Sequence, residues 1–519
     1  MALAWNIGSV PAAGLVEFTT AYARREFDAK FSGEISSLLL GHDRLVALRK
    51  HEHIEAETFS IVNYREADQI MEGWRDLLTR AEKIYGLVSN EEKPSYFQLV
   101  LHPIKASYVY NALRNAQAKN NLYAKQRRNT TNKVAQEVLN LFEDDFNLSE
   151  EYHAILNGKW NHMMRQPHYG FSATWHAPSR DMISGLCYVQ TRQDSSPIVG
   201  QMGVTVEGTE GVRPGLTNEE SDRTHPSRRD LVPGVTLPPM SPYGPPSRYF
   251  EIYSRGSKDL VWELEAAHSW VLLDRSSGEL RADGPDGRIE VSISWEAVPT
   301  DFDGMALISI RSDAGDFEQV HLPVSNKQVA SNFKGFVESD GYVSMEAAHY
   351  TAPREPSSPL SVQTAYRTLP FLGRTGAGGV ELARMPGNKL EEPIPFLEYS
   401  FYIFAETPMV FVLLYFNMTL DTDPTNALTY DVSLNDRPYT THRLVEVPKK
   451  PGELPPDWLA AVQDCVWIRK HDLGTIGEGP HTLKFRAGAQ NVILEKLVVE
   501  TSGLRKSYLG PPESKFIEC

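Results

Sequence analysis

The spacing of apolar residues in this chain changes from a helical period to strict alternation, and the change comes after about Trp160. Before that point, apolar residues recur three and four positions apart, which places them on one face of a helix. The clearest case lies between Tyr64 and Tyr85: Ala67, Ile70, Met71, Trp74, Leu77, Leu78, Ala81 and Tyr85. Asn63 followed by Glu66 matches a capping box at the start of this helix. Further helices with short polar links predict an antiparallel helical bundle over residues 1–165.

Alternation and turn signals dominate the rest of the chain. Residues 166–247 are rich in proline, glycine, serine and charge, which predicts a long extended connection. Beyond it, Ile289, Val291, Ile293 and Trp295 alternate with polar residues, and Asp-Gly pairs mark turns. We therefore predict a small immunoglobulin-like β-sandwich over residues 248–330. Longer apolar strands over residues 331–519 predict a C-terminal jelly-roll β-sandwich, so the predicted fold class is multidomain α plus β.

The charge balance narrows the classes of partner. The chain has 67 acidic and 52 basic residues, a formal net charge of −15. Nucleic-acid binders usually carry a basic surface, so we expect no nucleic-acid partner. No apolar stretch approaches the roughly 18 residues of a membrane span, so we expect no membrane partner either. An acidic soluble chain suits the binding of neutral polymers such as polysaccharides. The N-terminus lacks the basic region of a signal peptide, so none is visible in this chain.

Few residues suggest covalent modification. The odd number and wide spacing of the cysteines give neither a disulfide framework nor a zinc site, although a single pair remains open. These cysteines are Cys187, Cys465 and Cys519. Acceptor sequons for N-linked glycans are short and arise often by chance, so they are only candidates. They begin at Asn129, Asn147 and Asn417.

Catalytic and cofactor motifs are weak throughout. The adjacent acids Glu143, Asp144 and Asp145 could supply a pair of carboxylates for glycoside hydrolysis, but a solvated helix end explains them better. The His51-Glu52-His53 sequence lacks the spacing of a zinc-binding helix. We therefore predict no catalytic residue, no metal and no cofactor from these patterns.

One aromatic and imidazole cluster stands out. Rings beside amide and imidazole groups suit the apolar faces and hydroxyl groups of sugars. The cluster contains Trp160, His162, Gln166, His168, Tyr169 and Trp175. The alternative interpretation is a domain hinge in which the rings pack the bundle against the next domain, and it is favoured because buried aromatics are usually structural. Farther along, Arg374 is a candidate partner for a uronate carboxylate.

Several strings resemble glycoside hydrolase family 115. They are WNHMMRQPHYGFSATW (Trp160–Trp175), RYFEIYSRG (Arg248–Gly256), FVESDGYVSMEAAHY (Phe336–Tyr350), SYLGPPES (Ser507–Ser514) and LAWN (Leu3–Asn6). Their order and spacing agree with the family over nearly the whole chain. The resemblance implies a xylan α-1,2-glucuronidase family, whose members are extracellular and remove 4-O-methyl-glucuronic acid from glucuronoxylan.

The resemblance also implies which part of such an enzyme this is. The family places an α/β domain and a TIM-like barrel before the region seen here, and its catalytic carboxylates lie there. We therefore expect the non-catalytic C-terminal portion of the hydrolase, which supports the barrel and contributes to dimerisation or substrate binding. Its expected partners are xylan or another plant polysaccharide, a second copy of the chain, or the missing barrel half. The alternative is a free-standing carbohydrate-binding protein without hydrolase activity. Whether the chain is itself an enzyme stays open at this point.

Overall fold

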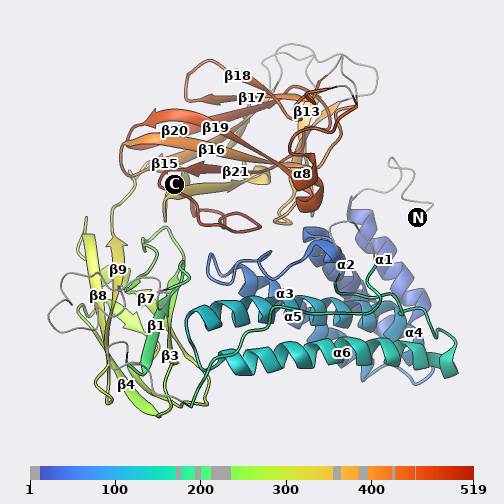
Figure 1. The fold of residues 1–519 in the computed structure, drawn as a ribbon. Helices are drawn as coiled ribbons and strands as arrows, with labels where there is room; N and C mark the ends of the chain where they lie inside the picture. The colour runs from blue at the N-terminus through green and yellow to red at the C-terminus, as the bar shows by residue number, and fades with distance from the viewer. Residues whose placement is uncertain are drawn as a thin grey trace.

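The computed structural model describes residues 12–170, 177–192, 200–211, 235–354, 364–384, 395–422, 427–450 and 452–518. These residues form a helical part followed by two β-sandwiches (Figure 1). The helical part and the first sandwich lie side by side, and the C-terminal sandwich lies above both of them. The predicted order of a helical region followed by β-sandwiches is therefore confirmed.

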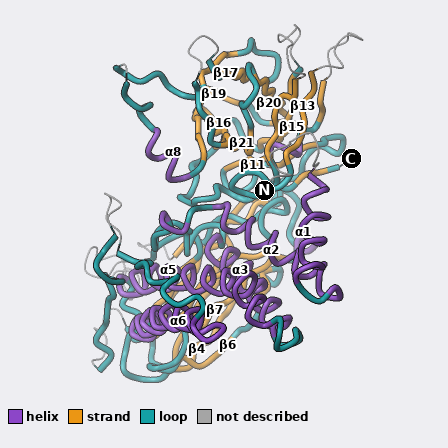
Figure 2. Tube along the Cα trace, turned by 90° about the vertical axis from the view of Figure 1, so that its right-hand side faces the viewer, coloured by secondary structure: helices purple, strands orange, loops and turns teal. Residues whose placement is uncertain are grey.

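The helical part is built around α3 and two long antiparallel helices. Its helices are α1 (Ala12–Glu26), α2 (Ser32–Leu48), α3 (Glu66–Tyr85), α4 (Lys93–Tyr96), α5 (His102–Lys125) and α6 (Thr131–Gly158). Helices α5 and α6 run side by side, and α3 packs against α5 (Figure 2). The apolar face predicted for α3 is the one that is buried, with Trp74 and Leu77 in the core beside Tyr96 and Val100 of the following segment.

The start of α3 differs from the predicted capping box. Arg65, with φ of 53°, turns the chain into the helix, and Glu66 is its first residue. The Glu66 carboxylate does not bond the amide of Asn63. It accepts hydrogen bonds instead from the backbone amides of Ser60, Tyr508 and Leu509, because the C-terminal segment packs over this end of the helix.

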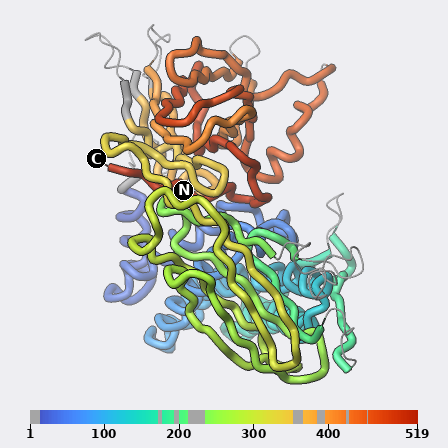
Figure 3. Tube along the Cα trace, turned by 90° about the vertical axis from the view of Figure 1, so that its left-hand side faces the viewer, coloured from blue at the N-terminus to red at the C-terminus, as the bar shows by residue number. Residues whose placement is uncertain are grey.

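The small sandwich consists of two sheets with strand orders β1-β3-β7-β5 and β2-β9-β8-β4-β6. Its strands are β1 (Met202–Val206), β2 (Val235–Thr236), β3 (Ser247–Ser254), β4 (Leu260–Ala266), β5 (Val271–Leu273), β6 (Ser277–Leu280), β7 (Gly287–Ile293), β8 (Asp303–Ser312) and β9 (Phe317–Ser325). Figure 3 shows the long strands of this sandwich in front of the helices.

The small sandwich reaches further back along the chain than the expected boundary at residue 248. Strand β1 pairs antiparallel with β3, and β2 pairs parallel with β9, although both lie in the segment 166–247 that the sequence predicts as a connection. Met202, Val204 and Val206 enter the core of the sandwich. The strand has only five residues, and the residues around it are polar, so the sequence does not indicate a strand there.

The C-terminal sandwich is the largest part of the chain. Its described strands and α-helix are β10 (Gly335–Val337), β11 (Tyr342–Glu346), β12 (Ala352–Arg354), β13 (Thr364–Leu369), β14 (Gly379–Arg384), β15 (Phe396–Ile403), β16 (Thr407–Asn417), β17 (Thr429–Leu434), β18 (Thr440–Arg443), α8 (Trp458–Asp464), β19 (Val466–Ile476), β20 (Gly479–Ala487), β21 (Leu494–Glu500) and β22 (Phe516–Ile517). One sheet has the order β18-β17-β20-β15-β10-β22, with β12 beside β15. The other has the order β13-β14-β21-β16-β19, with β11 beside β21.

Alternation of buried and half-buried residues along β15 and β20 places one face of the first sheet in the core. The facing sheet contributes Val410, Val412 and Leu414 from β16, and the two sets of side chains form one core. After β21 the chain leaves this sandwich, passes over the helical part, and returns as β22 to pair with β10. This returning segment brings residues 505–509 to the junction of all three parts.

Candidate functional site

A cavity of about 630 Å³ lies where the three parts of the chain meet, and we call it the junction cleft. The helical part lines it with the loop of residues 55–63 and with one face of α5. The small sandwich contributes the turn of residues 208–210 after β1. The C-terminal part contributes Arg374, the end of α8 and residues 506–508. Because each wall comes from a different part of the chain, the cleft exists only when all three are docked.

Apolar and hydrogen-bonding groups are mixed in the walls. The larger apolar side chains are Phe59, Ile61, Val62, Leu122 and Ile468, and Ala56 and Ala118 add smaller ones. The neutral polar ones are Thr58, Ser60, Asn63, Asn121, Thr209, Gln463 and Ser507. The rings of Phe59 and Tyr508 meet edge to face with their centroids 5.5 Å apart. Such a lining presents both apolar surface and neutral donors and acceptors to a ligand.

The two arginines and one lysine of the cleft are paired with acids of the cleft. Arg49 Nη1 lies 2.7 Å from Asp464 Oδ1, and Arg374 Nη2 lies 3.6 Å from Asp464 Oδ2. On the opposite wall, Lys125 Nζ lies 3.6 Å from Glu210 Oε2. Each cation named here therefore already has an anionic partner at the edge of the cleft.

Arg374, the candidate partner for a uronate, lies in the wall of this cleft but is already engaged. Its Nη1 donates to the carbonyl oxygen of Tyr508 at 2.5 Å, and its Nη2 donates to that of Asp464. The guanidinium lies 3.8 Å above the centroid of the Tyr508 ring, and the residue is only 6% exposed. These contacts engage both terminal nitrogens of Arg374 and make the residue a support of the wall.

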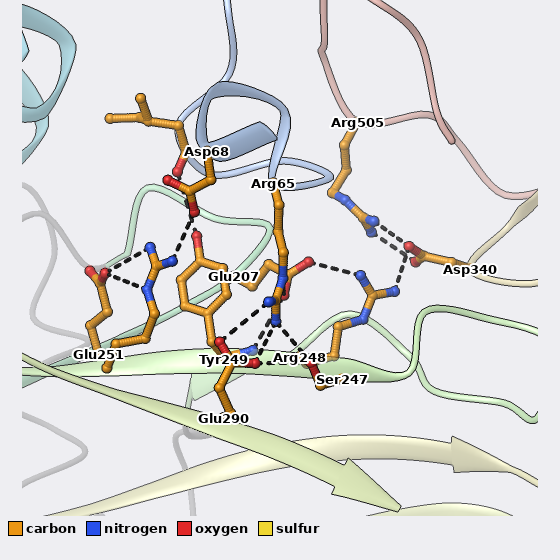
Figure 4. A network of polar contacts seen from close by, with 12 residues as sticks. Arg65, Asp68, Glu207, Ser247, Arg248, Tyr249, Glu251, Glu290, Asp340 and Arg505 are labelled. Carbon is orange, nitrogen blue, oxygen red and sulfur yellow. Dashed lines mark hydrogen bonds and ion pairs between the residues drawn. The ribbon is translucent and has the colours of Figure 1, made fainter. Parts of the chain in front are cut away.

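Beside the cleft, a network of buried charges joins the three parts (Figure 4). Arg248 of the small sandwich donates to Glu207 at 2.9 Å and to Asp340 of the C-terminal part at 2.8 Å. Arg505 from the returning segment donates to Asp340 at 2.8 Å. Arg65 from the helical part pairs with Glu290 at 2.7 Å. Arg248, Glu207 and Asp340 expose at most 2% of their side chains, so this network is inside the junction.

A second buried set holds the small sandwich on the ends of α5 and α6. Arg128 Nη1 lies 2.7 Å from Glu251 and 2.9 Å from Asp286, and Arg128 is 1% exposed. Beside it, the amide of Asn129 donates to acceptors on Ser254, Gly256 and Ala282. Together with the network of Figure 4, these contacts make the docking of the parts specific.

The aromatic and imidazole cluster predicted from the sequence does not converge on one surface. Trp160 packs against the core of the helical part, while His162 and Gln166 are exposed. His168 Nδ1 lies 2.7 Å from Asp145 Oδ2, and this hydrogen bond raises the pKa of the imidazole. Tyr169 is buried and stacks on the ring of Tyr110.

Trp175 lies outside the described residues. None of the described members of the cluster lines the junction cleft. The Asp145 carboxylate, one of the three adjacent acids considered as a catalytic pair, is the partner of His168, whereas Glu143 and Asp144 are exposed on α6.

The three candidate glycosylation sites differ in accessibility. Asn129 is buried, and its amide is occupied at the interface with the small sandwich. Asn417 is half-buried, and its amide donates to Glu495 Oε1 at 2.9 Å. Asn147 is exposed on α6. In the folded chain, Asn147 is therefore the sequon asparagine that is open to solvent.

Carboxyl groups with raised pKa values are the usual sign of a general acid, and three occur among the described residues. Burial raises the pKa of Glu66, of Asp286 and of Glu495. Each of the three accepts hydrogen bonds from the protein: Glu66 from three backbone amides, Asp286 from Arg128 and Thr130, and Glu495 from Asn417 and the amide of Arg374. They are structural acceptors, and none of them lines the junction cleft.

Over the same described ranges, no group of three or more His, Cys, Asp or Glu side chains is placed to hold a metal ion. Cys187 and Cys465 are free thiols, and Cys519 lies outside the described residues.

The sequence did not indicate most of the residues that form the cleft. Phe59 and Tyr508 lie far apart in the chain, and neither belongs to a periodic pattern. The sequence signals were Arg374, chosen as a partner for a uronate, and the string SYLGPPES, which contains Tyr508 and was noted only for its resemblance to a family tail. The loop of residues 55–63 gave no signal of its own.

Comparison with known proteins finds a family resemblance for the C-terminal part. Residues 335–513 match the family model described as the glycosyl hydrolase family 115 C-terminal domain. No curated protein matches the chain.

Three solved structures illustrate what the chain is similar to. A family 115 4-O-methyl-α-glucuronidase with specificity for decorated arabinogalactans is 14% identical, with a TM-score of 0.49 over 96% of this chain. The chain spans 43% of the length of that protein. The C-terminal family 6 carbohydrate-binding module of LamC, a laminarinase from Zobellia galactanivorans, is 10% identical and covers 31% of this chain and 98% of its own, with a TM-score of 0.19. A family 35 carbohydrate-binding module from Clostridium thermocellum is 12% identical over 30% of this chain and 97% of its own, also with a TM-score of 0.19.

Proposed function

We propose that this chain, which contains a glycosyl hydrolase family 115 C-terminal domain over residues 335–513, is a non-catalytic supporting portion of a glycoside hydrolase. The hydrolase would remove 4-O-methyl-glucuronic acid from a decorated plant polysaccharide, glucuronoxylan being the substrate that the sequence resemblance implies. The supporting portion holds its two sandwiches in fixed positions, so that a catalytic domain docked on it meets the polymer in one orientation.

The observation that carries this proposal is the buried charge network at the junction. Domains of one chain usually move relative to one another unless their interface is extensive and well packed. Here Arg248, with 1% exposure, contacts both Glu207 of its own sandwich and Asp340 of the C-terminal part. Separating the parts would take Asp340 away from Arg248 and Glu290 away from Arg65, and the loss of one partner of a buried ion pair costs several kcal/mol. A support needs this kind of rigidity.

The absence of a catalytic role is supported by the state of the carboxyl groups. Glycoside hydrolysis requires an acid and a second carboxylate on either side of the sugar, about 5–10 Å apart. Within the described ranges, the three carboxyl groups whose pKa is raised are buried and hydrogen-bonded to the protein. Among the described residues of the C-terminal part, Asp464 is the one carboxylate that lines the junction cleft, and it is paired with two arginines.

The test is an assay of sugar release. Purified chain is incubated with glucuronoxylan, and free 4-O-methyl-glucuronic acid is quantified by chromatography against a heat-treated sample. We expect no release above the heated sample. Release that disappears on heating would refute the non-catalytic role and direct attention to carboxylates outside the junction. Glucuronidated arabinogalactan serves as a second polymer, because the same acidic sugar decorates a different backbone.

The junction cleft favours a second candidate function, a free-standing carbohydrate-binding protein. A cavity of about 630 Å³ lies in the range of small-molecule sites. The two functions differ in what the chain does when a barrel-bearing catalytic domain is supplied in trans. A support would form a stable complex with that domain, whereas a free-standing binding protein would bind polymer and leave the domain unbound. Size-exclusion chromatography of the mixture separates these outcomes.

The proposal also implies the place of action and the partners. A polymeric plant polysaccharide is met outside the cell, so we expect the whole protein to be extracellular. Among the described helices, none is long and apolar enough to cross a membrane. Helix α1 exposes Leu15, Val16 and Phe18 to nearly half of their surface, and such a stripe suits a docked catalytic domain or a second copy of the chain.

A further inference from the structure

We infer that the junction cleft is a binding site for neutral sugar units, so that it holds the backbone of a polysaccharide and not its acidic side chain. That the ligand is a sugar rests on the proposed function. The place of the site and its preference for a neutral ligand rest on the geometry of the cleft itself.

Charge is the first reason for a neutral ligand. The side chains that line the cleft include four basic residues, Arg49, Lys125, Arg374 and Lys506. They also include four acidic residues, Glu55, Glu57, Glu210 and Asp464. Their formal charges cancel, although the whole chain carries −15. A site for a uronate would need an excess of positive charge or an arginine with a free pair of donors. The two buried arginines of this cleft share Asp464 instead.

The distribution of neutral groups is the second reason. A pyranose ring has apolar C–H faces and a rim of hydroxyl groups, so it binds best where apolar side chains alternate with neutral donors and acceptors. Within the loop of residues 55–63, Phe59 and Ile61 line the cleft beside Thr58 and Ser60. On the facing wall, Gln463 is exposed at the end of α8.

The third reason is that the walls are fixed before a ligand arrives. Ser60 donates its amide to the Glu66 carboxylate at 2.7 Å, and its hydroxyl accepts the amide of Asn63 at 3.0 Å. The amide of Gly208 donates to the carbonyl of Val62 at 2.8 Å, which joins the loop to the small sandwich. A pre-organised site spends little of its binding free energy on ordering the protein.

The direct test is calorimetric titration of the intact chain with xylotriose, and separately with xylotriose that carries one 4-O-methyl-glucuronic acid. We expect saturable binding of xylotriose. We also expect the decorated sugar to bind within about a factor of three of xylotriose, because the formal charges of the cleft cancel and its two buried arginines already pair with Asp464. Absence of xylotriose binding would overturn the inference. Tighter binding of the decorated sugar by more than about tenfold would overturn the preference for a neutral ligand.

Variants locate the binding on the chain. Ala118, half-buried on α5, lines the cleft, so Ala118→Trp fills part of it. Its matched control is Ala154→Trp, at an exposed position of α6 outside the cleft. We expect at least about tenfold weaker xylotriose binding for Ala118→Trp and unchanged binding for Ala154→Trp. Unchanged binding by Ala118→Trp would place the sugar elsewhere and refute the site.

Two smaller substitutions test the site even if the tryptophan variant fails to fold. Gln463→Ala removes an exposed amide from the cleft, and Gln69→Ala removes a comparable exposed amide from α3. We expect binding several-fold weaker for the first and unchanged for the second, with equal melting temperatures. Equal binding by both variants would contradict the inference.

Failure of the inference and failure of the proposed function give different results. Sugar release by the chain would refute the supporting role without changing the titrations. A chain that does not bind xylotriose would refute the sugar site and leave the supporting role in place.

Discussion

The carboxylate of Glu66, at the start of α3, accepts a hydrogen bond from the backbone amide of Tyr508 at 3.0 Å, although the two residues are 442 positions apart in the sequence. The same carboxylate accepts the amides of Ser60 and Leu509. A single buried side chain of the helical part thus ties together the loop that lines the junction cleft and the segment that returns from the C-terminal sandwich.

Replacement of this carboxylate should weaken the whole junction. Glu66→Gln places an amide N–H₂ group among three N–H donors, so at least one donor loses its acceptor. We expect a loss of about 2 kcal/mol in the free energy of unfolding, measured by denaturant titration. Glu91→Gln, at an exposed position just before α4, is the control and should change stability by less than about 0.5 kcal/mol. Equal stability of the two variants would show that Glu66 does not hold the junction.

Removing the charge of Asp340 should lower the free energy of unfolding more than removing the charge of an exposed acid. Asp340 accepts from Arg248 and Arg505 and is 2% exposed, so Asp340→Asn leaves the buried Arg248 and the half-buried Arg505 with one anionic partner fewer. We expect about 3 kcal/mol of destabilisation. Asp303→Asn removes an exposed acid that lies 2.9 Å from Lys327, and we expect less than about 1 kcal/mol. Similar losses for the two variants in denaturant unfolding would argue against the buried network as the source of rigidity.

Acid should destabilise the helical part through His102. Burial lowers the pKa of this imidazole to about 4, with the nearby Asp145 opposing the shift. In the unfolded chain this imidazole binds a proton near pH 6.5, whereas in the folded chain it stays neutral until the pH falls toward 4. The contribution of neutral His102 to the free energy of unfolding is therefore complete above pH 6.5 and is lost as the pH falls toward 4. The expected slope from this group is up to about 1.4 kcal/mol per pH unit.

The measurement for His102 is the free energy of unfolding between pH 4 and 7. His102→Phe keeps a ring beside Tyr152, whose centroid lies 4.7 Å from that of the imidazole, and should flatten the slope. His162→Gln changes an exposed histidine and should leave the slope as it is in the parent chain. A variant at His102 with an unchanged slope would contradict the expectation.

Helix α1 should mediate association. Leu15, Val16 and Phe18 are 49%, 46% and 47% exposed, so a charge among them should weaken apolar contacts with another molecule. We expect the parent chain to associate at high concentration in light scattering and Phe18→Glu to shift it toward the monomer. Leu87→Glu, at a 56% exposed site after α3, should not have this effect. A parent chain that is monomeric at high concentration would refute the prediction.

The three sequons should differ in whether they receive a glycan. In a host that attaches N-linked glycans, we expect a glycan at Asn147, which is exposed, and none at Asn129, whose amide is occupied inside an interface. Intact mass before and after glycosidase treatment counts the glycans, and Asn147→Gln should remove the mass difference. Asn129→Gln should leave it, and a glycan found at Asn129 would show that this interface is not formed when the glycan is attached.

Local patterns predicted the elements well, because each element buries a face that its own spacing defines. The apolar period assigned to residues 64–85 corresponds to α3, and the run Met409–Phe416 lies within β16. Strand β1 was not predicted, because its five residues lie in a segment whose composition is that of a linker. Glu66 was predicted to cap its own helix, since a local pattern contains no information about a segment more than 400 residues away.

The site could not be predicted in the same way. Arg374 was singled out as a partner for a carboxylate, and the structure places it at the junction cleft but commits it to Tyr508 and Asp464. The cleft is a product of three docked surfaces, so its residues share no spacing in the sequence. Only contacts between distant segments create it, and these depend on tertiary packing.

The hydrogen bonds of Glu66 also order the events of biosynthesis. The ribosome adds Glu66 442 residues before it adds Tyr508, so the amides of Tyr508 and Leu509 become available long after α3 has been made. Until then, the helical part carries a carboxylate that must remain hydrated, and the loop of residues 55–63 lacks one of its supports. The junction therefore closes only after residues 508 and 509 have been made, and a nascent chain that stops before residue 508 would leave the helices open to chaperones and proteases.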